Sequence, residues 1–266
     1  MTVAAADAPV LMYHEISASP FGSARLAVPP RSFAAQIAYL RDSGFTGITA
    51  GQLASALVQG DRLPSRPVVL TFDDGFADFH EAALPILQRY GFTATLYVTT
   101  GWIRDTDVPA GTAPGPMLSW SQLSEVAAAG IEIGAHSHRH PQLDQLSARA
   151  LRSELAMSKE ILEDGLRATV SGLAYPFGYS SARVRKLAQE LGYSHAYAVG
   201  NRQLGHNPDR YALPRLTVSR ATRLGVYGKM AECRNLSLIF LKHHALTKGW
   251  ALVRRSRRIT GRITTG

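Results

Sequence analysis

The chain has 266 residues, of which 45% are hydrophobic and 18% charged, with a single cysteine. This length is sufficient for one substantial core and is normal for a barrel domain, while the lone Cys233 excludes an internal disulfide and is compatible with a reducing compartment. The formal charge is +9, but residues 233–266 carry eight Lys or Arg and no acid, so the first 232 residues are almost neutral.

The N-terminal residues lack the features of an export signal. Residues 1–7 contain no basic residue and no adequate apolar stretch. No run in the chain approaches the roughly 18 apolar residues of a membrane-spanning helix. We therefore expect a cytoplasmic protein that acts in the cytosol or at the inner face of the membrane.

Apolar runs typical of β-strands alternate along the chain with helical patterns. The strand-like runs are 10–13, 68–72, 94–98, 131–133, 172–175 and 195–199, and the helical patterns include 33–40, 82–87 and 150–155. This alternation predicts parallel βα units, and barrel active sites form where the strands end. The prediction is an α/β fold of parallel βα units in residues 1–232 and a separate basic tail in residues 233–266.

Two adjacent carboxylates, Asp73 and Asp74, end the run 68–72, and Gly75 follows them. Burying either acid without a partner would cost about 3–5 kcal/mol, by analogy with broken buried ion pairs. The pattern therefore predicts a cation or a substrate proton beside them. The alternative is that the acids only cap a βα turn, since Asp-Gly is common turn chemistry.

Two histidines, His136 and His140, follow the run 131–133 at a spacing of four, which lets both rings reach one metal from a helical turn or a tight loop. With Asp74 they would give three protein ligands and an open position, the pattern of a catalytic metal site. Zinc is the default ion for such ligands, although Co²⁺, Ni²⁺ or Mn²⁺ would also be accepted. The ion would polarise a carbonyl and activate a water, and Asp73 would take the proton of that water. Alternatively, the histidines are ordinary surface residues.

The segments TFDDG (71–75) and HSHRH (136–140) resemble the first two signature motifs of the polysaccharide deacetylases, carbohydrate esterase family four with its NodB-homology domain. LAYPFG (173–178) resembles the third motif, and the resemblance covers about residues 8–220. It implies a distorted, incomplete (β/α) barrel. It also implies that Asp73 is the general base and that Asp74, His136 and His140 hold a divalent metal.

The third motif implies further roles in substrate binding. By resemblance, the backbone around Tyr175 would help to bind the oxyanion, and Pro176 and Phe177 would shape the acetyl pocket. Without the other motifs, an aromatic strand end packed into the core would explain the same three residues.

Two positions depart from the family pattern. Ala174 stands where the third motif often has an arginine that pairs with the base, and Arg215 or Arg220 is a candidate replacement. Residues 216–218 read LTV where the last motif often has a histidine that protonates the leaving amine. His14, at the end of the run 10–13, is the substitute candidate for this acid, and a histidine satisfied by backbone contacts is the alternative.

Two segments lie outside the motifs. Residues 105–116 are rich in Pro and Gly and could form a rim over a substrate groove or a plain surface connection. The tail has apolar residues at helical spacing beside a basic run, which suits an anionic membrane surface, whereas a terminal helix packed on the barrel is the alternative. Nucleic-acid binding is disfavoured because no nucleic-acid module is recognised.

The predicted function is metal-dependent removal of N-acetyl groups from amino sugars of a polysaccharide, oligosaccharide or glycan precursor. In the cytoplasm, the partner would be a soluble, nucleotide-linked or lipid-linked N-acetylated glycan. The alternatives are an O-deacetylase or deformylase that uses the same site, and a catalytically impaired glycan-binding or membrane-associated protein.

Overall fold

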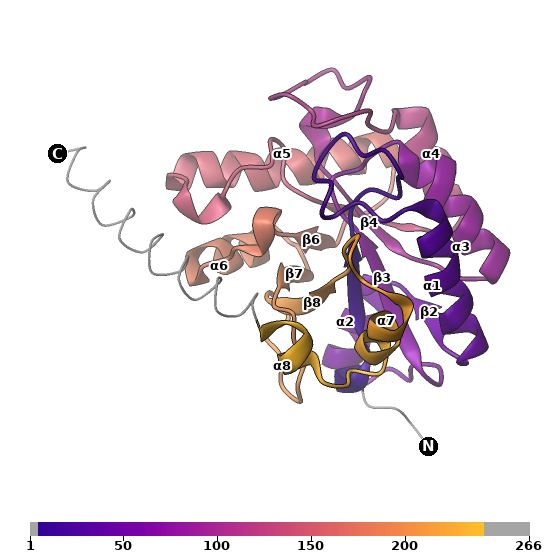
Figure 1. The fold of residues 1–266 in the computed structure, drawn as a ribbon. Helices are drawn as coiled ribbons and strands as arrows, with labels where there is room; N and C mark the ends of the chain where they lie inside the picture. Colours follow the sequence, from indigo (N-terminus) through magenta and orange to yellow (C-terminus); the bar gives the residue numbers. More distant parts are fainter. Residues whose placement is uncertain (1–4, 242–266) are drawn as a thin grey trace.

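The computed structural model describes residues 5–241, in which eight parallel strands form one sheet surrounded by helices (Figure 1). The strands are β1 (Val10–Tyr13), β2 (Thr46–Ile48), β3 (Pro67–Phe72), β4 (Thr95–Val98), β5 (Glu132–Ala135), β6 (Gly172–Ala174), β7 (His195–Val199) and β8 (Leu213–Thr217). The helices are α1 (Pro30–Asp42), α2 (Ala50–Gln59), α3 (Leu84–Tyr90), α4 (Trp120–Ala128), α5 (Ala148–Leu166), α6 (Ala182–Glu190), α7 (Leu224–Ala231) and α8 (Leu236–Ile239).

The sheet closes into a ring because β1 pairs with both β3 and β8. Seven strands make up this ring, and the short β2 pairs beside the first half of β3. The parallel βα units predicted from the alternation of strands and helices are therefore confirmed. The incomplete barrel that the family resemblance implied is confirmed as well, since seven strands close the ring. Two strands were not predicted from the sequence: β2, which has only three residues, and β8, which contains Pro214 and Arg215.

Alternate side chains of strand β3 belong to two different apolar clusters. Val68, Leu70 and Phe72 belong to the large cluster between the barrel and its helices, whereas Val69 belongs to a smaller cluster with residues of α2. Successive side chains of a strand point to opposite faces, so Asp73 continues the inward series of Val69. The strand period thus directs the first carboxylate into the barrel.

Helix α2 covers the amino ends of the strands. Its Ala50 amide donates to Thr95 Oγ1 at 2.8 Å, and its Ala50 carbonyl accepts from Tyr197 Oη at 3.0 Å. Thr49 and Gln52 form a capping box that fixes the start of this helix. One end of the barrel is thus closed, which leaves the carboxyl ends of the strands for a binding site.

The first part of the predicted tail belongs to the barrel rather than to a separate segment. Leu236 and Phe240 are buried in the main apolar cluster, and α8 follows α7 directly (Figure 1). Residues 242–266, with seven of the eight basic residues of the tail, lie outside the described residues. Within the described part, we find no helix long and apolar enough to cross a bilayer.

Candidate active site

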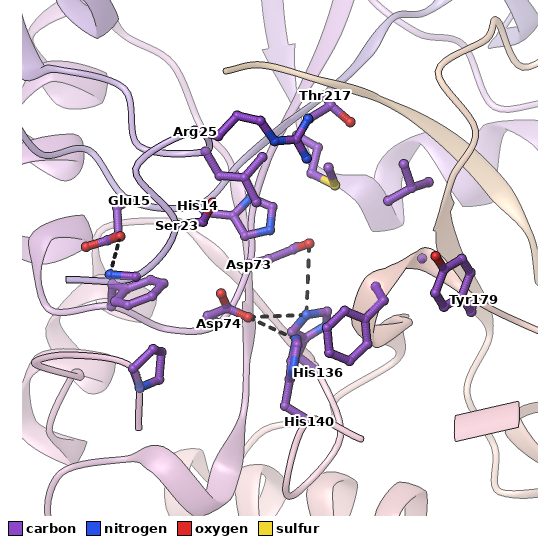
Figure 2. A pocket seen from close by; sticks show the side chains of 18 of the residues that line it. His14, Glu15, Ser23, Arg25, Asp73, Asp74, His136, His140, Tyr179 and Thr217 are labelled. Carbon is purple, nitrogen blue, oxygen red and sulfur yellow. Dashed lines mark hydrogen bonds and ion pairs between the residues drawn. The ribbon is translucent and has the colours of Figure 1, made fainter. Parts of the chain in front are cut away.

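Five of the predicted site residues, the expected metal ligands and proton-transfer groups, meet in one cavity of about 820 Å³ at the carboxyl ends of the strands. His14 follows β1, Asp73 and Asp74 follow β3, and His136 and His140 follow β5, and all five line the cavity (Figure 2). Its volume lies within the roughly 300–1,000 Å³ typical of small-molecule sites. The structure therefore brings together motifs that are more than sixty residues apart.

Asp74, His136 and His140 converge on one point. Asp74 Oδ1 lies 3.5 Å from His136 Nε2 and 3.3 Å from His140 Nε2 (Figure 2). His136 Nδ1 lies 2.8 Å from the Ala174 carbonyl oxygen, an acceptor that fixes the proton on Nδ1 and leaves the Nε2 lone pair facing Asp74. One ligand atom from each residue lies within 4.8 Å of the others, which is a geometry that suits a bound cation.

The electrostatics of this group also fit a cation. Burial, followed by the charge of Asp73, raises the pKa of Asp74 to about 8, and Asp74 Oδ1 has no hydrogen-bond partner among the described residues. Burial, followed by His136, lowers the pKa of His140 to about 3, and burial likewise lowers the pKa of His136. Two neutral imidazoles and one unsatisfied carboxylate oxygen form a donor set that a zinc-like ion would satisfy.

The two histidines lie in a tight loop, which is one of the two arrangements that their spacing allowed. His140 has φ 58° and Ser137 has φ 63°, in the left-handed region, and the His140 amide donates to Ser137 Oγ at 3.0 Å. The buried Glu154 carboxylate of α5 accepts the amides of His138 and Arg139 at 3.1 and 2.8 Å. Strained backbone persists only where its surroundings hold it, and here α5 anchors the loop.

The ring of His140 is held between two aromatic side chains. Trp102 stacks on it with ring centroids 5.1 Å apart and planes inclined by 29°, and Phe177 meets it at 4.7 Å and 63°. These contacts restrict the rotation of the imidazole and thereby position its Nε2 toward Asp74.

A buried arginine pairs with Asp73. The two terminal nitrogens of Arg215 in β8, Nη1 and Nη2, donate to the Asp73 carboxylate at 2.6 and 2.7 Å, and both side chains are almost fully buried. Burial alone would raise the pKa of Asp73, but Arg215 and then His136 outweigh it and hold this pKa well below its ordinary value. Of the two candidate replacements for the missing arginine, Arg215 therefore occupies the position, whereas Arg220 bonds to the Ala18 carbonyl at 3.2 Å.

Replacing Arg215 by Met should destabilise the fold by about 3–5 kcal/mol, because the substitution leaves the Asp73 carboxylate buried without its partner. Chemical denaturation of the purified variant would measure this loss. The double variant Arg215→Met with Asp73→Asn should recover much of the stability, and the exposed Arg220→Met should change it little. If Arg215→Met alone were as stable as the wild type, the ion pair would not be a main support of the site.

His14 lies in the cavity, and its Nδ1 is buried without a hydrogen-bond partner among the described residues. This observation argues against the alternative of a histidine satisfied by backbone contacts. Burial, opposed by the charge of Asp73, lowers the pKa of His14 to about 4, so the free site holds a neutral imidazole.

The expected role of Tyr175 needs correction. Its amide donates to the Tyr197 carbonyl at 3.0 Å and its hydroxyl to the Tyr211 carbonyl at 2.9 Å, so neither group is presented to an oxyanion. Tyr175 and Pro176 are buried and do not line the cavity, which is consistent with core packing. Phe177 does line the cavity and is 52% exposed, so it alone of the three is in a position to shape a substrate pocket.

Several cavity residues were not predicted from the sequence. They lie outside the three motifs, most of them in the segments that connect strands and helices and one at the end of β8, and include Ser23, Arg25, Trp102, Tyr179 and Thr217. Pro114, from the segment 105–116, also lines the cavity, which favours a rim over a plain surface connection for this segment. A loop residue reaches a site through the fold of the whole barrel, so no local pattern marks it in advance.

Comparisons with known proteins place this geometry in context. A family model described as polysaccharide deacetylase matches residues 60–196, which contain both the carboxylate and the histidine motifs. The provisionally named polysaccharide deacetylase YxkH of Bacillus subtilis is 29% identical over 227 residues, which cover 85% of this chain and 77% of that protein. The poly-β-1,6-N-acetyl-D-glucosamine N-deacetylase of Staphylococcus aureus is 23% identical over 202 residues, or 73% of this chain and 68% of that protein.

Solved structures show the same barrel. The Streptococcus pyogenes deacetylase PplD in complex with acetate matches with a TM-score of 0.77 and 25% identity, covering 87% of this chain and 99% of that chain. The seven-strand ring described above is thus a fold shared with known deacetylases.

Proposed function

Because this chain belongs to the polysaccharide deacetylase family, we propose that it is a metal-dependent hydrolase that removes N-acetyl groups from amino sugars of a polysaccharide, oligosaccharide or glycan precursor. The observation that carries the proposal is the convergence of Asp74, His136 and His140 beside the Asp73–Arg215 ion pair. Such a site combines a place for a Lewis acid with a carboxylate that stays charged, and metal-assisted amide hydrolysis uses both.

Each side chain has a distinct part in this mechanism. A divalent metal bound by Asp74, His136 and His140, most simply Zn²⁺, supplies the Lewis acidity that polarises the acetyl carbonyl. Asp73, kept ionised and oriented by Arg215, accepts the proton of the attacking water. His14, neutral in the free site, would take up a proton from solvent as negative charge develops on the carbonyl oxygen, because that charge raises the pKa of the imidazole. It would then pass this proton to the amine nitrogen as the C–N bond breaks.

Two observations support an active enzyme over a catalytically impaired binding protein. The impaired alternative rested on Ala174 in place of an arginine and on the missing late histidine. Arg215 in β8 pairs with Asp73 and so replaces the missing arginine. His14, which follows β1, lines the cavity and is available to replace the missing histidine. The O-deacetylase and deformylase alternatives need no different machinery, so only the choice of substrate separates them from N-deacetylation.

An acetate-release assay tests the proposal. We expect the purified protein to release acetate from N-acetylglucosamine oligomers when Zn²⁺ or Co²⁺ is added, and to stop when a chelator is present. The β-1,6-linked oligomers come first, because the Staphylococcus aureus relative is named for that polymer. Release only from O-acetylated sugars would support the alternative, and no release from any acylated glycan with any of Zn²⁺, Co²⁺, Ni²⁺ or Mn²⁺ would overturn the proposal.

The role of His14 predicts a difference between two kinds of substrate. His14→Ala should lower kcat for an N-acetyl sugar by about 10²–10⁴-fold, the usual contribution of a general acid. The loss should be far smaller for an activated acetyl ester, whose leaving group needs no proton. Steady-state kinetics on both substrates measures the difference, and equal losses would mean that His14 only supports the structure of the site.

The proposed location is the cytoplasm, with the basic tail at the inner membrane surface. Polybasic segments gain about 1 kcal/mol per Lys or Arg near anionic lipid. The seven basic residues after Leu241 lie outside the described residues, so this association stays a prediction from the sequence.

A further inference from the structure

One buried hydroxyl in the wall of the cavity has no hydrogen-bond partner among the described residues. Thr217 is the last residue of β8, lines the cavity and is only 6% exposed, yet its Oγ1 is unpaired. The backbone holds this residue in place, since its amide donates to Asn201 Oδ1 at 2.8 Å. An unpaired buried hydroxyl costs stability, so its presence requires an explanation.

The other buried threonines of the described part all have partners. The hydroxyl of each lies within 3.4 Å of a carbonyl, carboxylate or imidazole group; these residues are Thr71, Thr95, Thr99 and Thr100. Thr217 differs from them because it belongs to the cavity wall. A hydroxyl that the core leaves unpaired at a cavity wall is suited to bind a ligand.

The loop that follows β1 adds two polar side chains to the cavity wall. Ser23 and Arg25 both line the cavity, and Arg25 is the one Lys or Arg among the described lining residues. The loop is held at two points. The Glu15 carboxylate accepts two backbone amides of the loop, both at 2.9 Å, and the Arg25 carbonyl accepts the Arg220 amide at 2.9 Å. Both polar side chains therefore project from a fixed backbone.

Thr217 and Arg25 lie in the same region of the cavity. Thr217 is the register partner of Met12 in the pairing of β8 with β1, two residues before His14. Burial is the main cause that lowers the pKa of His14, and the charge of Arg25 is a smaller cause, so the guanidinium lies near this imidazole. Figure 2 shows Arg25 and Thr217 on one side of Asp73, with the proposed metal ligands on its other side.

The chemistry of these side chains favours a negatively charged ligand. A guanidinium and two hydroxyls supply several N–H and O–H donors, and arginine matches the geometry of phosphate and carboxylate oxygens. Hydrogen bonds from a cation to an anion are roughly twice as strong as those between neutral groups, so an anion gains more here than a neutral sugar. The nearby Asp73 carboxylate is already paired with Arg215 and does not oppose such a ligand.

On the basis of the proposed function, we propose that Thr217, Arg25 and Ser23 bind a phosphate or carboxylate group that the N-acetylated substrate carries beside its acetamido group. The substrate is then an anionic amino sugar. Its charge comes either from a phosphate, as in a phosphorylated glycan precursor, or from a carboxylate, as in an acidic polymer.

The first test removes the charge of Arg25. We expect the ratio of kcat/KM for N-acetylglucosamine 1-phosphate to that for the neutral methyl glycoside to fall about tenfold in Arg25→Gln, mainly through KM, the size of one charge-assisted hydrogen bond. Arg25→Lys should keep part of this preference. The control Arg41→Gln, which removes an exposed arginine at the end of α1, should keep all of it. Equal ratios in the wild type and Arg25→Gln would overturn the proposal.

The second test removes the unpaired hydroxyl. Thr217→Val keeps the shape of the side chain, so it should unfold at the wild-type temperature or above it, while the same kcat/KM ratio falls about threefold to tenfold. Thr217→Ser should keep the ratio. A hydroxyl that only supports the structure behaves in the opposite way. A lower unfolding temperature in Thr217→Val, with the same loss on both substrates, would remove Thr217 from the binding group.

A binding measurement keeps this inference separate from the proposed function. Isothermal titration calorimetry needs no turnover, so it remains informative if the wild type releases no acetate. The probes are the 1-phosphate, the neutral glycoside and an N-acetylated sugar with a carboxylate at carbon 6. Preference for either anionic sugar that is lost in Arg25→Gln and weakened in Thr217→Val supports the proposal, and the preferred anion identifies its source.

Two binding results would contradict the proposal. One is equal affinity for the charged and neutral sugars. The other is a preference for the anion that persists unchanged in Arg25→Gln and Thr217→Val, because the anion would then bind elsewhere, for instance at the proposed metal position.

Discussion

Replacing His140 by Ala should leave the purified protein without its equivalent of bound metal and reduce acetate release by about 10³-fold or more. A catalytic metal contributes several kcal/mol of charge stabilisation in the transition state, and each 1.36 kcal/mol is tenfold in rate. His140 Nε2 lies 3.3 Å from Asp74 Oδ1, and the ring is fixed between Trp102 and Phe177. Removing the ring therefore removes a proposed ligand that the protein has already oriented.

The matched control is His138, in the same loop. Its Nδ1 lies 2.9 Å from Thr100 Oγ1, and the residue does not line the cavity. An asparagine can replace that hydrogen bond, so His138→Asn should keep the metal and most of the activity. Metal content by plasma mass spectrometry, measured beside the rate, separates the two histidines. A His140→Ala protein that retained a full equivalent of zinc would remove His140 from the ligand set.

The convergence of Asp74, His136 and His140 was predictable from the sequence because each motif is local. A run of buried strand residues followed at once by Asp73 and Asp74 encodes both the position and the direction of the carboxylates. The same holds for His136 and His140 after β5. Parallel strands align their carboxyl ends, so the two motifs had to meet once the barrel was inferred.

The sequence alone left two candidates, Arg215 and Arg220, for the arginine that pairs with Asp73. Arg215 is 142 residues from Asp73, and its strand contains a proline, so nothing local indicates that the side chain points inward. Closure of the ring brings β8 beside β1, which in turn pairs with β3. The contact thus depends on the topology of the whole sheet, as do the positions of Trp102 and Tyr179 in their loops.

The same topology explains the error at Tyr175. The motif suggested that this residue faces the substrate, but its amide continues the pairing of β6 with β7. The chain leaves the sheet only at Pro176, and the strained Phe177 is the first side chain of the motif to reach the cavity. A sequence motif identifies the segment that forms a site. Which of its residues can contact a substrate depends on the hydrogen bonds that the others already make.

Asp73→Asn should lower kcat by about 10²–10⁴-fold without loss of bound metal, because the proposed mechanism makes Asp73 the base and the residue lies outside the group of converging ligand atoms. Asparagine preserves the shape of the side chain and one acceptor for Arg215, but it cannot take up a proton from water at neutral pH. The measurements are metal content and kcat on the same preparation.

The double variant with Arg215→Met makes this prediction sharper. Arg215 is buried beside Asp73, so Asp73→Asn alone leaves a buried cation with a weakened partner and should lose stability. The double variant removes that cation and should be more stable than Asp73→Asn, yet equally slow. Activity that returned with stability would mean that Asp73 serves the fold rather than the reaction, whereas a stable, metal-loaded and inactive double variant would assign the proton transfer to the carboxylate itself.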